Sequence, residues 1–550
     1  MPLTISRRWR NGVLSLACLS MVTPMVPNAM AQQAAPTTAN SWSPSPLPVL
    51  GDAAAQGLSP MAERRLGDRI MRSLLRDPDV IDDPLTLEYI SQLWTRLLNG
   101  ARQRGEIGPE LEASHAWQPF LVRDKSINAF ALPGGYIGVH LGLIAMTSTP
   151  DELASVLAHE LSHVTQRHIA RMIGQQGQQT LVSLASLLLG ILAATRNAGA
   201  AAQAMIYGGQ AAAVQQQLNF SRDMEREADR VGFGVLGDSG FAPSGMALMF
   251  EHLEAASRLN DDGNWPYLRT HPLTIERIGE AHARLGPAWT LAPSLQETSS
   301  ALWAQHQMIA MRARVLVDSR SESLQRLSTP QLAKDATRLQ LVTSWYGASL
   351  ALQRSNQPQA ADKALSEART LSAGLPSLQQ DVVIRMLDMA QAEGQLRARQ
   401  ARAALQSLDA LLSRPGTIAK AQARPEMLLQ AQATLALPDE PASHARRDAA
   451  LREEAARLQT HLSDHPSDAL SWSTLAEVWT QLNQPVRAVR AEAESTAALG
   501  DLQGAIDRVQ GARKRFRQPD AADVIELSVM DARVRSWQKQ QSEDLREERN

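Results

Sequence analysis

The chain has 550 residues, enough for two or more folded units, which excludes a peptide hormone or an isolated binding motif. Its 55 lysines and arginines nearly balance 57 aspartates and glutamates, so the chain has no global basic field of the kind that attracts nucleic acid. Hydrophobic residues make up 44% of the chain and aromatic residues 4%, a composition that favours helices over sheets. We therefore expect a mainly helical protein that does not bind nucleic acid.

The first 31 residues have the pattern of a secretory signal peptide. Three arginines between positions 7 and 10 precede an apolar run over residues 13–26, and Ala-Met-Ala at residues 29–31 fits a cleavage site. Because the run is short for a membrane span, we expect the signal to be cleaved and the protein to be exported. In a Gram-negative cell the destination would be the periplasm.

Two other interpretations of this segment stay open. Arg7-Arg8 could belong to a twin-arginine signal, and Cys18 could be a lipidated cysteine. Cys18 is the only cysteine of the chain, so cleavage after Ala31 would leave no disulfide and no catalytic thiol. Residues 32–50 are rich in Pro, Ser, Ala and Thr, a composition that predicts a disordered leader.

Between residues 51 and 148 the patterns predict helices followed by a small sheet. Residues 51–104 have a helical apolar periodicity. Three short strands are predicted at Phe120–Arg123, Ala129–Leu132 and Tyr136–His140, with a tight turn between the last two.

A helix with strong start signals is predicted from Thr149. Thr149 is a favourable N-cap, Pro150 occupies the first turn, and Glu152 stands three residues after the cap, as in a capping box. We expect this helix to run to Gly174. The apolar run over residues 181–194 that follows has two interpretations, a buried core helix or a lid or membrane-facing hairpin.

The predicted helix carries His-Glu-Leu-Ser-His at residues 159–163. His159 and His163, four residues apart, project from one helix face and can bind one tetrahedral metal ion. Glu160 lies beside them, and a carboxylate there can take a proton from water and pass it to a leaving amine, as in metalloproteases. His168 is left out of the metal site because it lies about 140° around a continuous helix from His163.

A third metal ligand is predicted about sixty residues later, in Ser-Arg-Asp-Met-Glu-Arg-Glu-Ala-Asp at residues 221–229. Glu225 and Asp229 lie one turn apart on a second predicted helix. Glu225 can complete a His-His-Glu zinc site, and Asp229 can orient a ligand imidazole. Glu227 is expected to point elsewhere, because it is two residues from Glu225.

The C-terminal half has the pattern of helical hairpins. A Pro-containing segment at residues 285–296 predicts a hinge. Trp345 followed by Asn356-Gln-Pro, and Trp472 followed by Asn483-Gln-Pro, reproduce the small-residue rhythm of tetratricopeptide repeats. A plain helical bundle is the alternative, since each match is degenerate.

Three motifs in the same order resemble those of the zinc metallopeptidase (gluzincin) family that contains HtpX and the CAAX prenyl protease. They are residues 159–163, residues 221–229, and His271-Pro-Leu-Thr-Ile-Glu-Arg277. With its signal peptide and repeats, the chain is similar to the periplasmic β-barrel assembly-enhancing group of this family over nearly its whole mature length. The resemblance implies a mainly α chain, with a zincin-like α+β catalytic domain followed by an α-helical tetratricopeptide-repeat solenoid.

The resemblance also implies roles for individual residues. One Zn²⁺ would be bound by the two histidines and Glu225, with Glu160 as the catalytic base. His271 and Arg277 would face the active-site cleft, where they could stabilise an oxyanion. Alternatively, His271 could occupy the open zinc position and act as a latency switch, or be an ordinary loop histidine.

The segment Asn128, Ala129, Phe130 and Ala131 resembles the edge strand of this family. An open strand edge can bind an extended peptide by backbone pairing, without reading its side chains. An ordinary core hairpin is the alternative, and the two are compatible because one face can pack while the edge stays open.

These features predict an exported zinc endopeptidase. We expect a signal peptide over 1–31, a leader over 32–50, a metalloprotease domain over 51–290, a connecting helix over 291–320 and a repeat domain over 321–550. The resemblance implies quality control or assembly of outer-membrane β-barrel proteins, with unfolded or misassembled proteins as substrates and repeats that bind clients or the assembly machinery. Peripheral membrane contact through residues 181–194 is a further expectation. The alternative is a periplasmic chaperone or scaffold with latent protease activity.

Overall fold

The computed structural model describes residues 58–176, 222–259, 266–286, 298, 300–330, 334–415, 418–516 and 521–549. The signal peptide, the leader and the apolar run over residues 181–194 lie outside the described residues, so the expectations for them stay predictions. Within the described ranges, no helix has the length and apolar character needed to cross a membrane.

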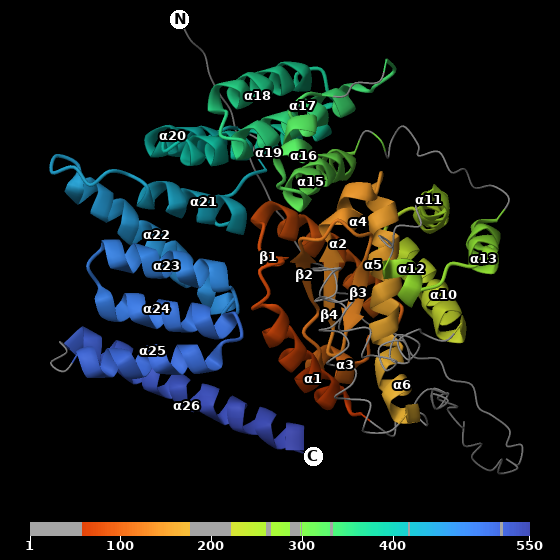
Figure 1. The fold of residues 1–550 in the computed structure, drawn as a ribbon, viewed down its shortest axis with the longest axis horizontal. Helices are drawn as coiled ribbons and strands as arrows, with labels where there is room; N and C mark the ends of the chain where they lie inside the picture. The colour runs from red at the N-terminus through yellow and green to blue at the C-terminus, as the bar shows by residue number, and fades with distance from the viewer. Residues whose placement is uncertain are drawn as a thin grey trace, which may run out of the picture. The chain divides into compact units, whose positions relative to one another are not determined.

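The N-terminal part combines one small sheet with helices (Figure 1). Its elements are α1 (Pro60–Leu74), β1 (Val80–Ile81), α2 (Pro84–Gln103), α3 (Pro109–Ser114), β2 (Gln118–Val122), β3 (Ala129–Leu132), β4 (Tyr136–His140), α4 (Leu141–Met146), α5 (Pro150–Thr165), α6 (His168–Gln176), α10 (Arg222–Asp238), α11 (Ser244–Leu259), α12 (Pro266–Thr270) and α13 (Ile275–Leu285). Thr149 caps α5, and its hydroxyl accepts a hydrogen bond from the Glu152 backbone N–H at 3.0 Å. The Glu152 carboxylate in turn accepts a hydrogen bond from the backbone N–H of Ser148, one residue before the cap.

The four strands pair in the order β1-β2-β4-β3. β2 and β4 are parallel, and the two outer strands pair antiparallel with their neighbours. α5 contacts β3, α2, α10 and α11, and every residue from Glu152 to Thr165 is buried. The small sheet expected from the sequence is confirmed, with β1 as an additional strand, and it supports the helix that carries His159 and His163.

The helix expected to run to Gly174 is in fact two helices. α5 ends at Thr165, and Arg167 adopts a left-handed φ of 52° before α6 begins at His168. The guanidinium of Arg167 binds the buried Glu63 carboxylate at 3.2 Å. The single-helix prediction was wrong here because a tertiary contact holds Arg167, whose backbone conformation is uncommon for a residue with a side chain.

The C-terminal part consists of helices and their connecting turns, with no strand among its described residues. Its helices are α15 (Ala301–Val317), α16 (Ser321–Leu327), α17 (Arg338–Arg354), α18 (Pro358–Ser372), α19 (Ser377–Arg397), α20 (Ala401–Leu412), α21 (Arg424–Leu435), α22 (His444–Asp464), α23 (Ala469–Gln481), α24 (Pro485–Ala498), α25 (Leu502–Arg515) and α26 (Ala521–Arg549). Successive helices contact each other, for example α17 with α18 and α23 with α24 (Figure 1). The mainly α fold with a helical C-terminal array is therefore confirmed.

Four turns of this array share one backbone geometry. Asn356, Arg399, Asn483 and Gly500 have left-handed φ values of 57°, 60°, 53° and 83°. In each turn the N–H of the next residue donates to the carbonyl five positions earlier, at 2.8 to 3.1 Å, as in a Schellman motif. Two of these turns are the Asn-Gln-Pro sequences, whereas Arg399 forms the same turn without that signature.

Arginines join the helical array to the start of α2. Three of them each bind one carboxylate near that helix start and one within the array. The sets are Arg312 with Asp83 and Glu393, Arg385 with Glu88 and Glu426, and Arg424 with Asp82 and Asp468. Buried side chains from both parts, including Tyr89 and Tyr346, also belong to one hydrophobic core.

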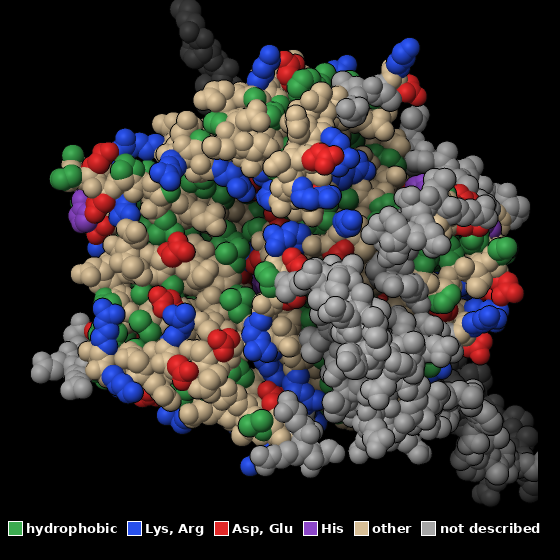
Figure 2. Space-filling view, viewed as in Figure 1, with side chains coloured by type: hydrophobic (Ala, Val, Ile, Leu, Met, Phe, Trp, Pro, Cys, Tyr) green, Lys and Arg blue, Asp and Glu red, His purple; other side chains and the backbone are tan. Residues whose placement is uncertain are grey.

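The last helices of the array reach α1. Arg72 binds Asp544 of α26 at 2.7 Å. Gly500 approaches Arg72 so closely that a Cβ atom there would collide with the Arg72 carbonyl oxygen. On the face drawn in Figure 2, basic and acidic side chains are interspersed over the C-terminal helices.

Candidate metal centre

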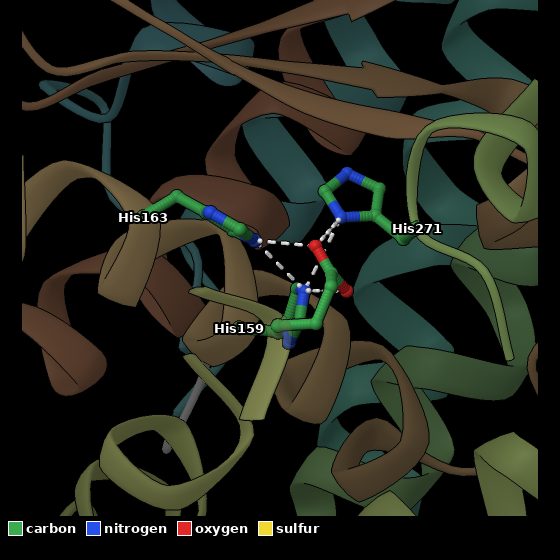
Figure 3. Close-up of side chains that lie close together, drawn as sticks. His159, His163 and His271 are labelled. Carbon is green, nitrogen blue, oxygen red and sulfur yellow. Dashed lines mark hydrogen bonds and ion pairs between the residues drawn. The ribbon is translucent and has the colours of Figure 1, made fainter. Parts of the chain in front are cut away.

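Four side chains from three segments meet in the interior of the N-terminal part (Figure 3). His159 and His163 lie on α5, Glu225 lies on α10, and His271 lies between α12 and α13. One ligand atom of each residue lies within 4.8 Å of the others, and all four residues are buried. The structure thus places the three predicted ligands together, with His271 beside them.

The spacing of these atoms fits a tetrahedral zinc ion. The Nε2 atoms of His159 and His163 are 3.0 Å apart, and Glu225 oxygens lie 3.5 and 3.4 Å from them. Ligand atoms about 2.0 to 2.1 Å from a tetrahedral zinc ion are about 3.4 Å from one another. Two imidazoles and a carboxylate are also the donor set of hydrolytic zinc sites that keep one position open.

Asp229 and Arg277 lie behind the ligands. Asp229 Oδ1 is 2.9 Å from His159 Nδ1, on the far side of the ring from the ligand cluster. Arg277 binds the Asp229 carboxylate through two nitrogens, and its Nη1 lies 2.9 Å from Glu225 Oε2. Although burial opposes the change, hydrogen bonds from Arg277 and His159 lower the pKa of Asp229 to about 2. This placement supports the predicted orienting role of Asp229, and the Arg277 guanidinium is engaged by the carboxylates of Asp229 and Glu225.

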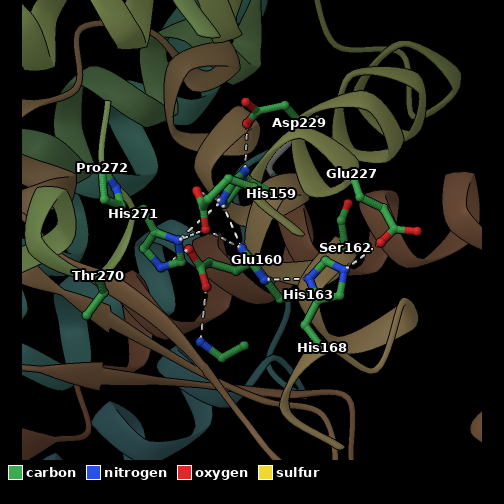
Figure 4. Close-up of polar contacts among 12 residues, drawn as sticks. His159, Glu160, Ser162, His163, His168, Glu227, Asp229, Thr270, His271 and Pro272 are labelled. Carbon is green, nitrogen blue, oxygen red and sulfur yellow. Dashed lines mark hydrogen bonds and ion pairs between the residues drawn. The ribbon is translucent and has the colours of Figure 1, made fainter. Parts of the chain in front are cut away.

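Glu160 connects the ligand cluster to the edge strand (Figure 4). Its Oε2 accepts a hydrogen bond from the Ala131 N–H of β3 at 3.1 Å. Its Oε1 lies 3.5 Å from His271 Nε2 and has no hydrogen-bond partner among the described residues. Burial raises the pKa of Glu160. One carboxylate oxygen is therefore fixed by the sheet while the other faces the cluster.

β3 is the outer strand of the sheet at this point, as predicted. Of the four residues proposed to bind substrate, Asn128, Ala129 and Ala131 are buried and Phe130 is half-buried. The Phe130 ring packs edge-on against His140 at a centroid distance of 5.9 Å. One face of the strand thus packs in the core, while the Ala131 N–H is directed to Glu160 instead of β4.

Two residues that the sequence reasoning left outside the metal site lie next to it (Figure 4). His168 Nδ1 is 2.8 Å from His163 Nδ1, and His168 Nε2 is 3.1 Å from Glu227 Oε2. The separation of about 140° assumed a continuous helix, and this assumption was wrong because the chain breaks at Arg167. The sequence does contain His168 as a third histidine shortly after His163. Its position beside His163 could be recognised only once the helix break at Arg167 was known.

Comparisons with known proteins place this site among metallopeptidases. Residues 105–285 match the model described as peptidase family M48. The chain is 29% identical over 500 residues to the β-barrel assembly-enhancing protease of Yersinia pestis, covering 90% of this chain and 94% of that protein.

Two further relatives cover less of the chain. A Vibrio cholerae protein, whose name assigns the same role provisionally, is 37% identical over 286 residues, which are 51% of this chain and 54% of that protein. The mitochondrial metalloendopeptidase OMA1 of Schizosaccharomyces pombe is 32% identical over 163 residues, which are 30% of this chain and 44% of that protein.

Proposed function

We propose that the protein is an exported zinc-dependent endopeptidase, because residues 105–285 of this chain belong to peptidase family M48. The family and the relatives make it a metallopeptidase. We propose in addition that the metal is zinc, that the protein is exported, and that its clients are unfolded or misassembled proteins. The observation that carries the proposal is the His-His-Glu cluster with Glu160 held beside it by the edge strand.

The residues of the site divide the reaction among themselves. His159, His163 and Glu225 would hold the metal ion. A bound zinc ion supplies a Lewis acid that polarises the scissile carbonyl and lowers the pKa of water. Glu160 takes a proton from the attacking water on Oε1 and delivers it to the nitrogen of the leaving amine. Asp229 holds the proton of the His159 imidazole on Nδ1, so that Nε2 remains free to bind metal.

The edge strand β3 offers backbone groups with which an extended substrate peptide can pair. An extended peptide that pairs with residues 128–131 would lie beside Glu160, because Ala131 and Glu160 are hydrogen-bonded. Backbone pairing accepts many side chains, which suits unfolded or misassembled proteins as substrates.

The proposal is tested by measuring zinc content and casein cleavage for the mature chain from Gln32 and its Glu160→Gln variant. Glutamine keeps an oxygen for the Ala131 N–H but cannot accept the proton. We expect stoichiometric zinc in both proteins and cleavage only by the wild type. Glu276→Gln, on an exposed carboxylate of α13, is the matched control and should retain cleavage. Absence of zinc from the wild type would refute the metal site.

A latent enzyme that acts mainly as a chaperone or scaffold is the second candidate. The observation in its favour is the place of His271, whose Nδ1 lies 2.9 Å from Glu225 Oε1 and 3.4 Å from His159 Nε2. A fourth donor at this distance can compete with water for the open metal position. His271→Ala should then raise casein cleavage, whereas a role of His271 in stabilising the oxyanion predicts a loss.

We further propose that the helical array binds outer-membrane β-barrel precursors or their assembly machinery in the periplasm. The name of the Yersinia pestis relative supports this role. A groove of about 1060 Å³ between α19, α21, α23, α24 and α25 offers a surface for such partners. We propose the protease domain over 51–290, the connecting helix over 291–320 and the repeats over 321–550.

This partner proposal can be tested with a photo-crosslinking residue placed at Gln432 inside the groove, in cells that produce β-barrel precursors. Crosslinks to precursors or to the assembly machinery are expected. The same probe at Lys363, an exposed residue of α18 outside the groove, is the control. Equal crosslinking from both positions would argue against a specific role of the groove.

A further inference from the structure

A chain of hydrogen bonds leads from the metal ligand His163 toward the protein surface. His163 Nδ1 lies 2.8 Å from Nδ1 of His168, and His168 Nε2 lies 3.1 Å from Glu227 Oε2. Arg171 donates to the same Glu227 oxygen from Nη1 at 2.7 Å. The His168 side chain is fully buried, whereas the Glu227 side chain is 30% exposed.

The chemistry of these groups fixes the direction of each proton. When His163 binds metal through Nε2, its proton must sit on Nδ1, which then donates to Nδ1 of His168. A neutral His168 that accepts on Nδ1 carries its own proton on Nε2 and donates it to Glu227. The carboxylate of Glu227 can only accept a hydrogen bond. Through His168 it therefore determines which nitrogen of His163 carries the proton.

We propose that His168 and Glu227 are positioning residues that hold His163 in the tautomer and orientation required for zinc binding. This inference rests on the proposed function, because it presupposes a metal at the ligand cluster. Asp229 acts on His159 directly, whereas Glu227 acts on His163 through one intervening imidazole.

The backbone break at Arg167 makes this arrangement geometrically available. In an uninterrupted helix, residue 168 would lie about 140° away from His163. The left-handed φ of 52° at Arg167 starts α6 in a new direction and places His168 against the His163 ring. Arg171, one turn further along α6, then holds Glu227 of α10 in reach of His168.

The test compares two variants of similar shape, His168→Asn and His168→Leu, by the zinc affinity of the metal-free mature protein in competition with a chromogenic chelator. Leucine removes the acceptor for the His163 proton, and the zinc dissociation constant should rise about 10- to 100-fold. Asparagine can keep one acceptor oxygen near Nδ1 and should bind zinc about 10-fold more tightly than the leucine variant. A role limited to filling space would not separate the two.

A second pair of variants lies on α10, where each changed residue is two positions from Glu225. Glu227→Gln should weaken zinc binding about 10-fold, and Asp223→Asn, on a side chain that is 93% exposed, should leave it unchanged. This pair decides the question even if the His168→Leu protein does not fold. Wild-type affinity in Glu227→Gln, or equal losses in the two His168 variants, would overturn the positioning role. Failure of the wild type to bind zinc would instead refute the proposed function itself.

Discussion

Arg277 binds both oxygens of the Asp229 carboxylate, through Nε at 2.7 Å and Nη2 at 2.8 Å, and Asp229 is thereby aimed at the His159 imidazole. The residues belong to three separate helices, α13, α10 and α5. A bidentate pair of this kind restrains the carboxylate in direction as well as in distance. The orientation of the His159 imidazole, a proposed metal ligand, therefore depends on Arg277 as well as on Asp229.

Replacement of Asp229 by asparagine should weaken zinc binding about 10- to 100-fold, because His159 loses a charged partner that fixes its tautomer. The zinc dissociation constant of the metal-free protein measures the effect. Asp238→Asn changes an exposed carboxylate at the end of the same helix and should have no effect on zinc binding. Wild-type affinity in Asp229→Asn would contradict the orienting role.

The position of the edge strand β3 depends on Gly138 of the neighbouring strand β4. A Cβ atom at Gly138 of β4 would lie 2.6 Å from Cε1 of Phe130, which packs between Phe120 and His140. Gly138→Ala should lower the free energy of unfolding by about 1 to 3 kcal/mol through overpacking, and casein cleavage should fall as β3 shifts.

Denaturant unfolding of Gly138→Ala and of Gly279→Ala gives the comparison. A Cβ atom at Gly279 of α13 would meet no heavy atom within 4 Å, so alanine there should be neutral or stabilising. Equal stability of the two variants would show that the Phe130 ring moves aside without loss of stability.

Arg312 is a buried cation shared by Asp83 and Glu393. Arg312→Met should destabilise the protein by about 3 to 5 kcal/mol, because the Asp83 carboxylate is left buried without its partner. The double variant Asp83→Asn/Arg312→Met should be more stable than Arg312→Met alone, since asparagine can still cap α2 without a charge. Chemical denaturation of the wild type, the single variants Arg312→Met and Asp83→Asn, and the double variant gives the comparison, and strictly additive losses would argue against the ion pair.

Stability should fall in mild acid because of buried neutral histidines. His306 is fully buried, with Nδ1 2.8 Å from the Tyr89 hydroxyl and Nε2 3.1 Å from the Thr147 carbonyl, and burial lowers its pKa to about 4. Below pH 6.5 this histidine binds a proton in the unfolded chain, whereas its buried imidazole stays neutral in the folded protein. The free energy of unfolding therefore decreases. This loss continues down to about pH 4 and amounts to about 3 kcal/mol for a depression of this size.

Denaturant unfolding at several values between pH 7 and pH 4.5 measures this dependence. His306→Gln should have a shallower dependence than the wild type, although His115 and His140, whose pKa values are also lowered to about 4 by burial, retain part of it. His465→Gln, at an exposed position, should leave the slope unchanged. If the free energy of unfolding of His306→Gln changed with pH as steeply as that of the wild type, His306 would not contribute to the pH dependence.

The parts of the fold that could be predicted from the sequence are those set by local spacing. A four-residue interval puts His159 and His163 on one face of a helix, and a four-residue interval does the same for Glu225 and Asp229. The alternation of short apolar runs likewise indicated the strands of the small sheet. Each of these features needs only the periodicity of one element.

The parts that could not be predicted depend on contacts between distant segments. The left-handed Arg167 is sustained by Glu63, more than a hundred residues earlier, and without it His168 points away from the site. The burial of His306 and Arg312 of α15 against α2 likewise joins segments that are more than two hundred residues apart in the sequence. Side-chain partners at such separations leave no trace in local sequence patterns.

The contact between α1 and the last helices has a consequence for the order of folding. Arg72 meets Gly500 and Asp544, which are synthesised more than 400 residues later. During synthesis, α1 can pack against the nearby sheet, but one of its sides stays uncovered until the last helices have been made. The first helix is therefore fully covered only after the last helices of the array have folded against it.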